Sequence, residues 1–343
     1  MLAQIGVVET MQAHGIPVSN FIIRDGDQRL LQMSFDKLPS TFRHLLMIPQ
    51  TSTETLLEAR LNELGGAVHR GVSAVQVTAA AEGARVTTIS AAGEQTISAR
   101  YVVGADGMRS VVREAAGIGF EGEAYGESFV LADVRMDWPL GAGEVSFFFS
   151  PAGLVVIAPL PDGSYRVVAT LDDAPEKPGI EDIQKLLDAR GPTKGAQITE
   201  IGWSSRFRVH HRLADAYRSG PFLLMGDAAH VHSPAGGQGM NTGLVDAIVL
   251  SGALARVLRD HEPDTVLDDY ARTRRPAAAE VLALAGRLTR VATVHSVVVR
   301  RIRNLVLRVL NRFPAFKTRL ALGFSGLGRS QYSVLPGGAR PVS

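Results

Sequence analysis

The fold of this chain is decided by one stretch, Gly226-Asp227-Ala228-Ala229-His230, which continues through Ser233-Pro234-Ala235-Gly236-Gly237-Gln238-Gly239-Met240-Asn241-Thr242-Gly243. The apolar run 222–225 before it suits a buried parallel strand. After it, apolar residues at helical spacing over 240–258 predict a helix, and the first backbone N–H groups of a helix are unpaired. Because glycines admit close approach and the helix dipole favours anions, the stretch predicts an anion-binding site.

Asp227 falls at the carboxyl end of the predicted strand. A carboxylate in that place accepts hydrogen bonds from sugar-like hydroxyls, as acidic residues do in dinucleotide-binding folds. Strand, loop and helix together therefore predict a nucleotide cofactor. The alternative is a glycine-rich structural turn whose aspartate caps the helix, because Gly and Asp are common in turns.

A second stretch has the same design, Tyr101-Val102-Val103-Gly104-Ala105-Asp106-Gly107-Met108-Arg109-Ser110. A β-rich run ends in Gly-x-Asp-Gly, and a short helix follows with Ser110 as its N-cap and Gly117 at its end. Asp106-Gly107 alone is more typical of a turn than of a binding site. Two strand-to-helix crossings, each with an aspartate at the strand tip, favour a shared site.

These two stretches resemble the flavin-binding motifs of the FAD-dependent aromatic hydroxylases, the class A flavoprotein monooxygenases of the para-hydroxybenzoate hydroxylase fold. The first motif is Gly104 to Gly107 with Ser110 and Arg113, and the second runs from Gly226-Asp227 through Asp246. Weaker support comes from Pro49-Gln50, since a glutamine in such a segment contacts FAD in that family. The resemblance covers most of the chain.

The resemblance implies an α/β fold with a Rossmann-like FAD-binding domain, an inserted antiparallel β-sheet substrate domain and C-terminal helices. We expect 1–119 and 221–320 to form the two parts of the FAD-binding domain, the second with the C-terminal helices. Residues 120–220 would form the substrate domain and 321–343 a tail, which ends in the loose segment Pro336-Gly337-Gly338. Alternation over 129–134, 144–149, 154–159 and 165–171 predicts the antiparallel strands.

Family members open with a strand, a Gly-x-Gly-x-x-Gly turn, a helix and a second strand. This sequence contains no such turn, and Gly237-x-Gly239-x-x-x-Gly243 has the wrong spacing. We therefore expect an N-terminally truncated FAD-binding domain, short by roughly 30 residues or more. A misplaced start codon or a truncated gene would explain it, and a degenerate protein is the alternative. Residues 1–11 predict a helix, closed by Gly15.

The implied reaction is hydroxylation of an aromatic or polyketide-like small molecule. NADPH or NADH would reduce FAD, dioxygen would add at flavin C4a, and the resulting hydroperoxide would transfer one oxygen atom, so the hard chemistry belongs to the cofactor. Two alternatives stay open. One is an FAD-dependent dehydrogenase or reductase on the same fold, because a fold does not fix a reaction. The other is a non-catalytic remnant that cannot hold FAD.

The resemblance also implies which residues bind the cofactor: Gln50, Asp106, Gly107, Asp227, Ala228, Pro234, Gly237, Gly239, Met240 and Asn241. Asp227 would contact the ribityl chain, and Asp106 with Gly107 would support the flavin and pyridine-nucleotide region. The helix that begins near Gly239 would stabilise negative charge on the reduced flavin. The carbonyl of Pro234 would lie near the substrate and the flavin edge.

No residue stands out as the acid or base that deprotonates a phenol. His210 and His232 are candidates, with Pro234 beside them and with His211 and His230 as further histidines, because imidazole titrates near neutral pH. The alternative is that these histidines shape the loop, cap an element or fill the core. Four histidines without a carboxylate at a supporting spacing do not predict a metal site.

Composition agrees with a globular enzyme core. The net charge of +2 over 343 residues argues against a nucleic-acid binder, and the absence of cysteine excludes disulfides and thiolate catalysis. No signal peptide and no apolar run of membrane-spanning length is expected, so the chain is predicted to be cytoplasmic and not an integral membrane protein. A homodimer stays open.

The sequence leaves alternatives open for the apolar residues of the predicted sheet and for the predicted C-terminal helices. Phe147, Phe149 and Val156 face either an apolar pocket or the core between sheet and helices. Predicted helices over 277–312 mix Val, Leu and Arg, which suits packing on the FAD-binding domain, a partner subunit or a membrane surface.

Overall fold

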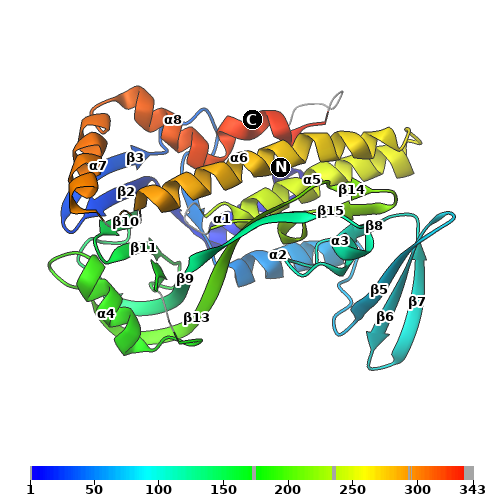
Figure 1. Ribbon diagram of the computed structural model, residues 1–343, viewed down its shortest axis with the longest axis horizontal. Helices are drawn as coiled ribbons and strands as arrows, with labels where there is room; N and C mark the ends of the chain where they lie inside the picture. The colour runs from blue at the N-terminus through cyan, green and yellow to red at the C-terminus, as the bar shows by residue number, and fades with distance from the viewer. Residues whose placement is uncertain (1, 172–174, 234–236, 293, 295, 336–343) are drawn as a thin grey trace.

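The structure is a computed structural model that describes residues 2–171, 175–233, 237–292, 294 and 296–335. Within these ranges it is a mixed α/β protein with one large sheet, two three-stranded sheets and a two-stranded one. Figure 1 shows the large sheet at one end of the long axis and a small sheet at the other, joined by long helices. The predicted α/β class with C-terminal helices is confirmed.

The large sheet has the order β16-β13-β9-β12-β11-β10-β2-β3. Neighbours are antiparallel except for β10 and β2, which are parallel. The strands are β2 (Asn20–Asp25), β3 (Gln28–Ser34), β9 (Phe120–Asp137), β10 (Glu144–Ser150), β11 (Gly153–Pro159), β12 (Tyr165–Thr170), β13 (Gln197–Ala214) and β16 (His230–Val231). The four alternating segments of the sequence are thus strands, while β2 and β3 join the same sheet from the range expected to be the first part of the FAD-binding domain.

Alternation along β10 explains why this sheet has two covered faces. Phe148 points into a cluster with Ile183 and Leu187 of α4 (Ile180–Arg190). Phe147 and Phe149 point the other way, into a cluster with Phe324 of α8 (Pro314–Ser325). Phe147, Phe149 and Val156 are all buried in that second cluster. Of the two alternatives, an apolar pocket or the core between sheet and helices, the structure shows the core.

The cofactor motifs belong to a separate layer with one parallel strand pair among the described residues. β8 (Val102–Gly104) pairs with β15 (Phe222–Leu224), and β14 (Arg218–Ser219) runs antiparallel beside β15. α3 (Val111–Ala115), η2 (Gly226–Ala228), α5 (Gly239–Leu258) and α6 (Thr265–Ala292) follow the strands. Leu223 and Leu224 are fully buried against Val249 and Leu250 of α5 and Tyr270 of α6.

Several smaller elements lie before the first motif. They are η1 (Leu2–Ile5), α1 (Val8–His14), β1 (Ile16–Val18), β4 (Leu45–Met47), α2 (Gln50–Glu63), β5 (Ser73–Ala80), β6 (Gly83–Ser90) and β7 (Gly93–Ala99). The single helix expected over 1–11 is wrong, because Gly6, with φ +75°, separates η1 from α1. β5 to β7 form an antiparallel sheet that projects from the body in Figure 1.

The C-terminal region is helical up to Ser333. α7 (Val297–Leu310) and α8 are followed by η4 (Leu327–Ser333). Arg329 of η4 donates to the side-chain oxygen of Gln238 at 2.8 Å, and the carbonyl of Tyr332 accepts from Arg274 at 2.8 Å. The first part of the predicted tail, 321–335, is therefore held against α5 and α6. The rest of that predicted tail, 336–343, lies outside the described residues.

α5 is long and apolar enough to pass as a membrane span by length and composition, which differs from the expectation that no run would. Val249, Leu250, Ala253 and Val257 are nevertheless buried in the cluster that also holds Tyr270 of α6. α5 is thus a core helix of the motif layer.

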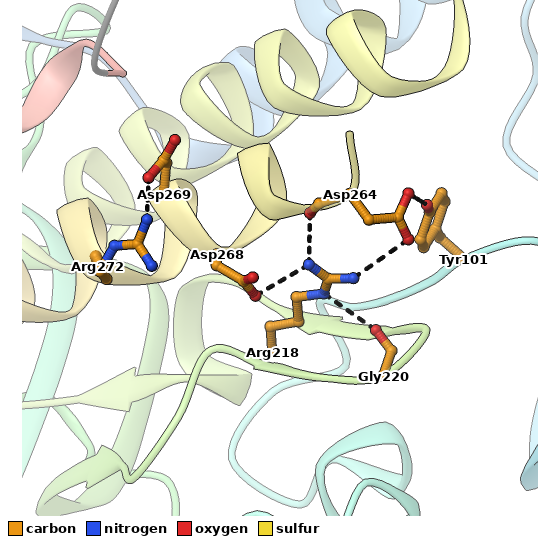
Figure 2. Close-up of polar contacts among 7 residues, drawn as sticks. All are labelled: Tyr101, Arg218, Gly220, Asp264, Asp268, Asp269 and Arg272. Atoms are coloured by element: carbon orange, nitrogen blue, oxygen red, sulfur yellow. Dashed lines mark hydrogen bonds and ion pairs between the residues drawn. The ribbon is translucent and has the colours of Figure 1, made fainter. Parts of the chain in front are cut away.

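A polar cluster fixes the beginning of α6 to the strands. Arg218 donates to the carbonyl of Asp264 at 2.6 Å and to the carboxylate of Asp268 at 2.9 Å, and the hydroxyl of Tyr101 donates to the carboxylate of Asp264 at 2.6 Å (Figure 2). Arg218 also donates to the carbonyl of Gly220 at 3.1 Å. One guanidinium therefore joins the β14 turn to the helix.

Replacing Arg218 with alanine should lower the free energy of unfolding by about 1–2 kcal/mol, since charge-assisted hydrogen bonds are lost but the partners stay partly solvated. Urea unfolding measures the change. Arg272→Ala is the matched control, because its side chain is 70% exposed and, within the part of the chain that the structure describes, its one ion pair is with Asp269. The control should change the free energy by less than about 0.5 kcal/mol. Equal effects of the two substitutions would contradict the prediction.

Candidate functional site

The two motifs meet because β8 and β15 are parallel and in register. Val102 lies opposite Phe222 and Gly104 opposite Leu224, and the backbone N–H of Met225 donates to the carbonyl of Gly104 at 3.0 Å. Parallel strands end at the same edge of a sheet, and ligands of open α/β sheets bind outside that edge. The loops that carry Asp106 and Asp227 therefore begin side by side.

Arg113 binds both loops. Its guanidinium donates to the carbonyl of Met108 in the first motif at 2.8 Å and to the carbonyl of Ala228 in the second at 2.9 Å. The guanidinium also stacks over the ring of Phe120, 4.0 Å from its centre. Burial lowers the pKa of Arg113 below its ordinary value. The backbone N–H of Arg113 in turn donates to Ser110 Oγ at 2.9 Å, so the predicted N-cap of α3 is confirmed.

Asp246, on α5, fixes the second motif through hydrogen bonds. Its side chain is fully buried, and its carboxylate accepts from the backbone N–H of Gly226 at 3.1 Å, from His230 Nε2 at 2.7 Å and from Arg274 Nε at 2.7 Å. Burial by itself raises the pKa of Asp246, but the hydrogen bonds from His230 and Arg274 outweigh it and leave the pKa below its ordinary value. His230 therefore serves the fold of the loop.

Glycine permits the close contact between this loop and α5. Gly226 has φ +57°, and a Cβ on Gly243 would lie 3.3 Å from the Cα of Gly226. The glycines at the start of α5 are not in close contact: a Cβ on Gly237 or Gly239 would meet no atom of the described residues within 4 Å. As far as the described residues show, the space beside the first turn of α5 is thus open.

The first turn of α5 has no side-chain cap. Gln238 stands at the N-cap position, but its side chain donates to the carbonyl of Phe324 at 2.6 Å and accepts from Arg329. The N–H groups of the first turn and the positive end of a 20-residue helix thus adjoin glycine-lined space, with the exposed carboxylate of Asp227 nearby on η2. This donor and acceptor set fits a ligand that has anionic groups and hydroxyls, as FAD does.

Comparison with known proteins agrees with this geometry. The model of a family described as FAD binding domain matches residues 1–285. This chain belongs to that FAD-binding family. It is 32% identical over 357 aligned positions to 6-methylpretetramide 4-monooxygenase of Streptomyces rimosus, an alignment that covers 97% of this chain and 64% of that protein. The chain spans 57% to 64% of the length of this and two further curated relatives.

Two solved structures have a similar fold. The anhydrotetracycline hydroxylase of Streptomyces rimosus superposes with a TM-score of 0.77 at 30% identity, covering 95% of this chain and 65% of that one. The p-nitrophenol 4-monooxygenase of Pseudomonas putida DLL-E4 superposes with a TM-score of 0.85 at 23% identity, covering 95% and 85%.

The structure brings most of the predicted FAD-binding residues together, though not all. Asp227, Ala228, Gly237, Gly239, Met240 and Asn241 lie on the second motif, and Asp106 and Gly107 lie on the first. Asp106 accepts from the backbone N–H of Val112 at 3.3 Å, so its carboxylate also contacts the first turn of α3. Gln50 begins α2, is exposed and donates to Glu54 at 2.8 Å, with no hydrogen bond to either motif among the described residues. Pro234 lies outside the described residues.

The candidate histidines differ in what surrounds them. His232 donates through Nδ1 to the carbonyl of Ser233 at 2.9 Å, so Nε2 carries the lone pair, and that atom is buried without a hydrogen-bond partner among the described residues. Burial lowers the pKa of His232. His210 and His211 lie on β13, opposite β9. Burial lowers the pKa of His211 as well, although Glu123 raises it.

Arg274 was missed by the sequence analysis, and Asp246 was named only as the end of a motif. The available signal was one aspartate among apolar residues of a predicted core helix, since a buried carboxylate requires a cationic partner. Among the described residues no group of three or more His, Asp or Glu side chains is arranged to hold a metal ion.

Replacing Asp246 with asparagine should lower the free energy of unfolding at neutral pH by about 3–5 kcal/mol, because Arg274 stays buried without its counter-charge. The folded pKa of Asp246 is depressed below 3.8, so its contribution is present above that pH and is lost as the pH falls through the folded value. Urea unfolding at several pH values should therefore show wild type and variant converging in acid.

Glu144→Gln is the control, because Glu144 and Arg24 form another buried pair, 2.6 Å apart, in the large sheet. Both variants should lose stability at neutral pH, but only Asp246→Asn should also weaken FAD binding. Equal FAD affinity in the two variants would contradict the role of Asp246 in holding the loop.

Proposed function

We propose that this chain contains the FAD-binding and substrate-binding core of an FAD-dependent monooxygenase. It would consume NADPH or NADH and dioxygen and hydroxylate an aromatic or polyketide-like small molecule. The observation that carries the proposal is the pair of aspartate loops joined by Arg113 beside the open first turn of α5. The relatives named above, which act on 6-methylpretetramide and anhydrotetracycline, support the substrate class.

The residues of the second motif would divide the work of holding FAD. The N–H groups at the start of α5 would stabilise negative charge on the cofactor, and Asp227 would accept hydrogen bonds from its hydroxyls. Arg113 and Asp246 would keep the two loops in place without touching the cofactor. FAD, when bound, supplies the transfer of reducing equivalents and the activation of dioxygen.

His232 is our choice among the candidate bases. Its lowered pKa keeps the imidazole neutral at neutral pH, and the bond from Nδ1 to Ser233 leaves the Nε2 lone pair to accept a proton. A phenolic substrate that donates to Nε2 would become a better nucleophile toward oxygen. His210 is the competing candidate, since its Nδ1 is also buried without a hydrogen-bond partner among the described residues.

Replacing Asp227 with alanine should weaken FAD binding by about 10- to 100-fold, the equivalent of one or two charge-assisted hydrogen bonds. Titration of the full chain with FAD, followed by flavin fluorescence and by the visible absorption retained after desalting, measures the affinity. Asp260→Ala is the matched control, because Asp260 is exposed and its one ion pair among the described residues is with the exposed Arg259. Unchanged FAD affinity in the Asp227 variant would overturn the assignment, and absence of any FAD binding by wild type would overturn the function.

The rate of oxygen-dependent hydroxylation should fall as the pH drops below about 6.5, because protonated His232 cannot accept a proton. Since the pKa of His232 is lowered, the midpoint of this fall should lie below 6.5. His232→Gln should reduce the rate and remove the pH dependence, whereas His210→Gln should keep it. The reverse pattern would assign the base to His210. Consumption of NADPH with an artificial acceptor but without oxygen-dependent product would favour a dehydrogenase or reductase.

A further inference from the structure

The charges of this chain are separated along its length. Residues 281–343 contain eleven Lys and Arg side chains and no Asp or Glu, whereas the whole chain has 36 basic and 34 acidic residues. The first 280 residues thus carry 25 basic and 34 acidic side chains. Such asymmetry is typical of chains that bind an anionic surface.

An exposed apolar stripe lies within this acid-free region. Residues at positions i, i+4, i+7, i+8 and i+11 of α7 share one face of the helix. We call them the α7 stripe: Val298, Ile302, Leu305, Val306 and Val309, which are 65%, 57%, 56%, 47% and 44% exposed. Phe313, just after α7, extends it and is 55% exposed. Contiguous exposed apolar side chains of this kind mark an interaction surface.

The opposite side of α7 is anchored, which fixes the direction of the stripe. Arg303 and Asn304 are buried, and Arg303 donates to the carbonyls of Val291 at 3.1 Å and Phe149 at 3.3 Å. Asn304 donates to the carboxylate of Asp25 at 2.5 Å. Figure 1 shows α7, in orange, at the outer end of the large sheet. The stripe therefore faces away from the protein body.

Arginines border the stripe along one side. Arg301, Arg308 and Arg312 follow each other at spacings of seven and four residues, which places them on adjoining helix turns in one row. All three are exposed, and none is in an ion pair among the described residues. An apolar stripe thus has a row of uncompensated cations at its edge.

We propose that the α7 stripe docks on an anionic phospholipid surface. The apolar side chains would enter the boundary between headgroups and acyl chains, and the three arginines would reach the lipid phosphates. A symmetric contact between two copies through α7 is disfavoured, because two helices without acidic residues would bring arginines together without counter-charges. A lipid surface supplies the apolar layer and the anions at once. α7 would then lie in the interface rather than span the membrane.

Flotation of the purified full chain with lipid vesicles tests this docking. Vesicles made of equal parts phosphatidylserine and phosphatidylcholine should carry the protein, vesicles of phosphatidylcholine alone should carry far less, and added salt should release it. Ile302→Asp should abolish binding. Ile97→Asp is the matched control, because Ile97 lies on β7, is 47% exposed and is far along the chain from α7.

The contribution of charge is tested separately. Replacing Arg301, Arg308 and Arg312 together with glutamine should weaken binding on the order of a hundredfold, at roughly fivefold per arginine near an anionic surface. The control replaces Arg43, Arg85 and Arg259, also exposed, and lowers the net charge equally. Thermal unfolding should give all these variants the melting temperature of wild type within a few degrees, since the changed side chains are exposed.

Three results would overturn the proposal. One is equal flotation with the two kinds of vesicle. Another is unchanged flotation of Ile302→Asp. The third is a wild-type protein that does not bind vesicles and elutes as a dimer, together with an Ile302→Asp variant that elutes as a monomer. The α7 stripe would then be a contact between two copies. None of these readouts depends on FAD, so this proposal and the proposed monooxygenase activity fail independently.

Discussion

The buried carboxylate of Asp246 is the point on which the site depends. A carboxylate with no access to water is stable only when nearly every oxygen lone pair has a donor. Its donors come from three elements: Gly226 of η2, His230 of β16 and Arg274 of α6. One charge on α5 therefore fixes the turn that presents Asp227, the strand that follows it and the helix that covers both.

Arg113 solves the complementary problem for the first motif. It has no carboxylate partner among the described residues, and its buried guanidinium is satisfied by the carbonyls of Met108 and Ala228 and by the face of Phe120. Phe120 begins β9, which runs into the large sheet. The contact that aligns the two loops thus also sets where the long strand β9 begins its course into the large sheet.

The sequence predicted what depends on neighbours in the chain. Ser110 caps α3 because a serine and the N–H three residues later need nothing else, and alternation along 144–149 is enough to predict a strand. Long-range partners were not predictable. Nothing in the short segment 20–34 indicates that β2 pairs with β10, some 120 residues away, and the carbonyl of Tyr332 could not be assigned to Arg274 because backbone acceptors carry no sequence signature.

The arginines of residues 281–343 explain why the positive charge of this region is exposed on α7. Those that are buried use backbone and amide oxygens, as Arg303 does with Phe149 and Asn304 and Arg329 does with Gly323 and Gln238. Such oxygens solvate a cation but do not neutralise it. No Asp or Glu follows Glu280 in the sequence, so the carboxylates that act on these two arginines come from earlier in the chain, Asp25 for Arg303 and Glu280 for Arg329. The positive charge of the region is most accessible around α7, where the apolar side chains are most exposed as well. The exposed arginines and the exposed apolar side chains together favour a partner that is both anionic and apolar.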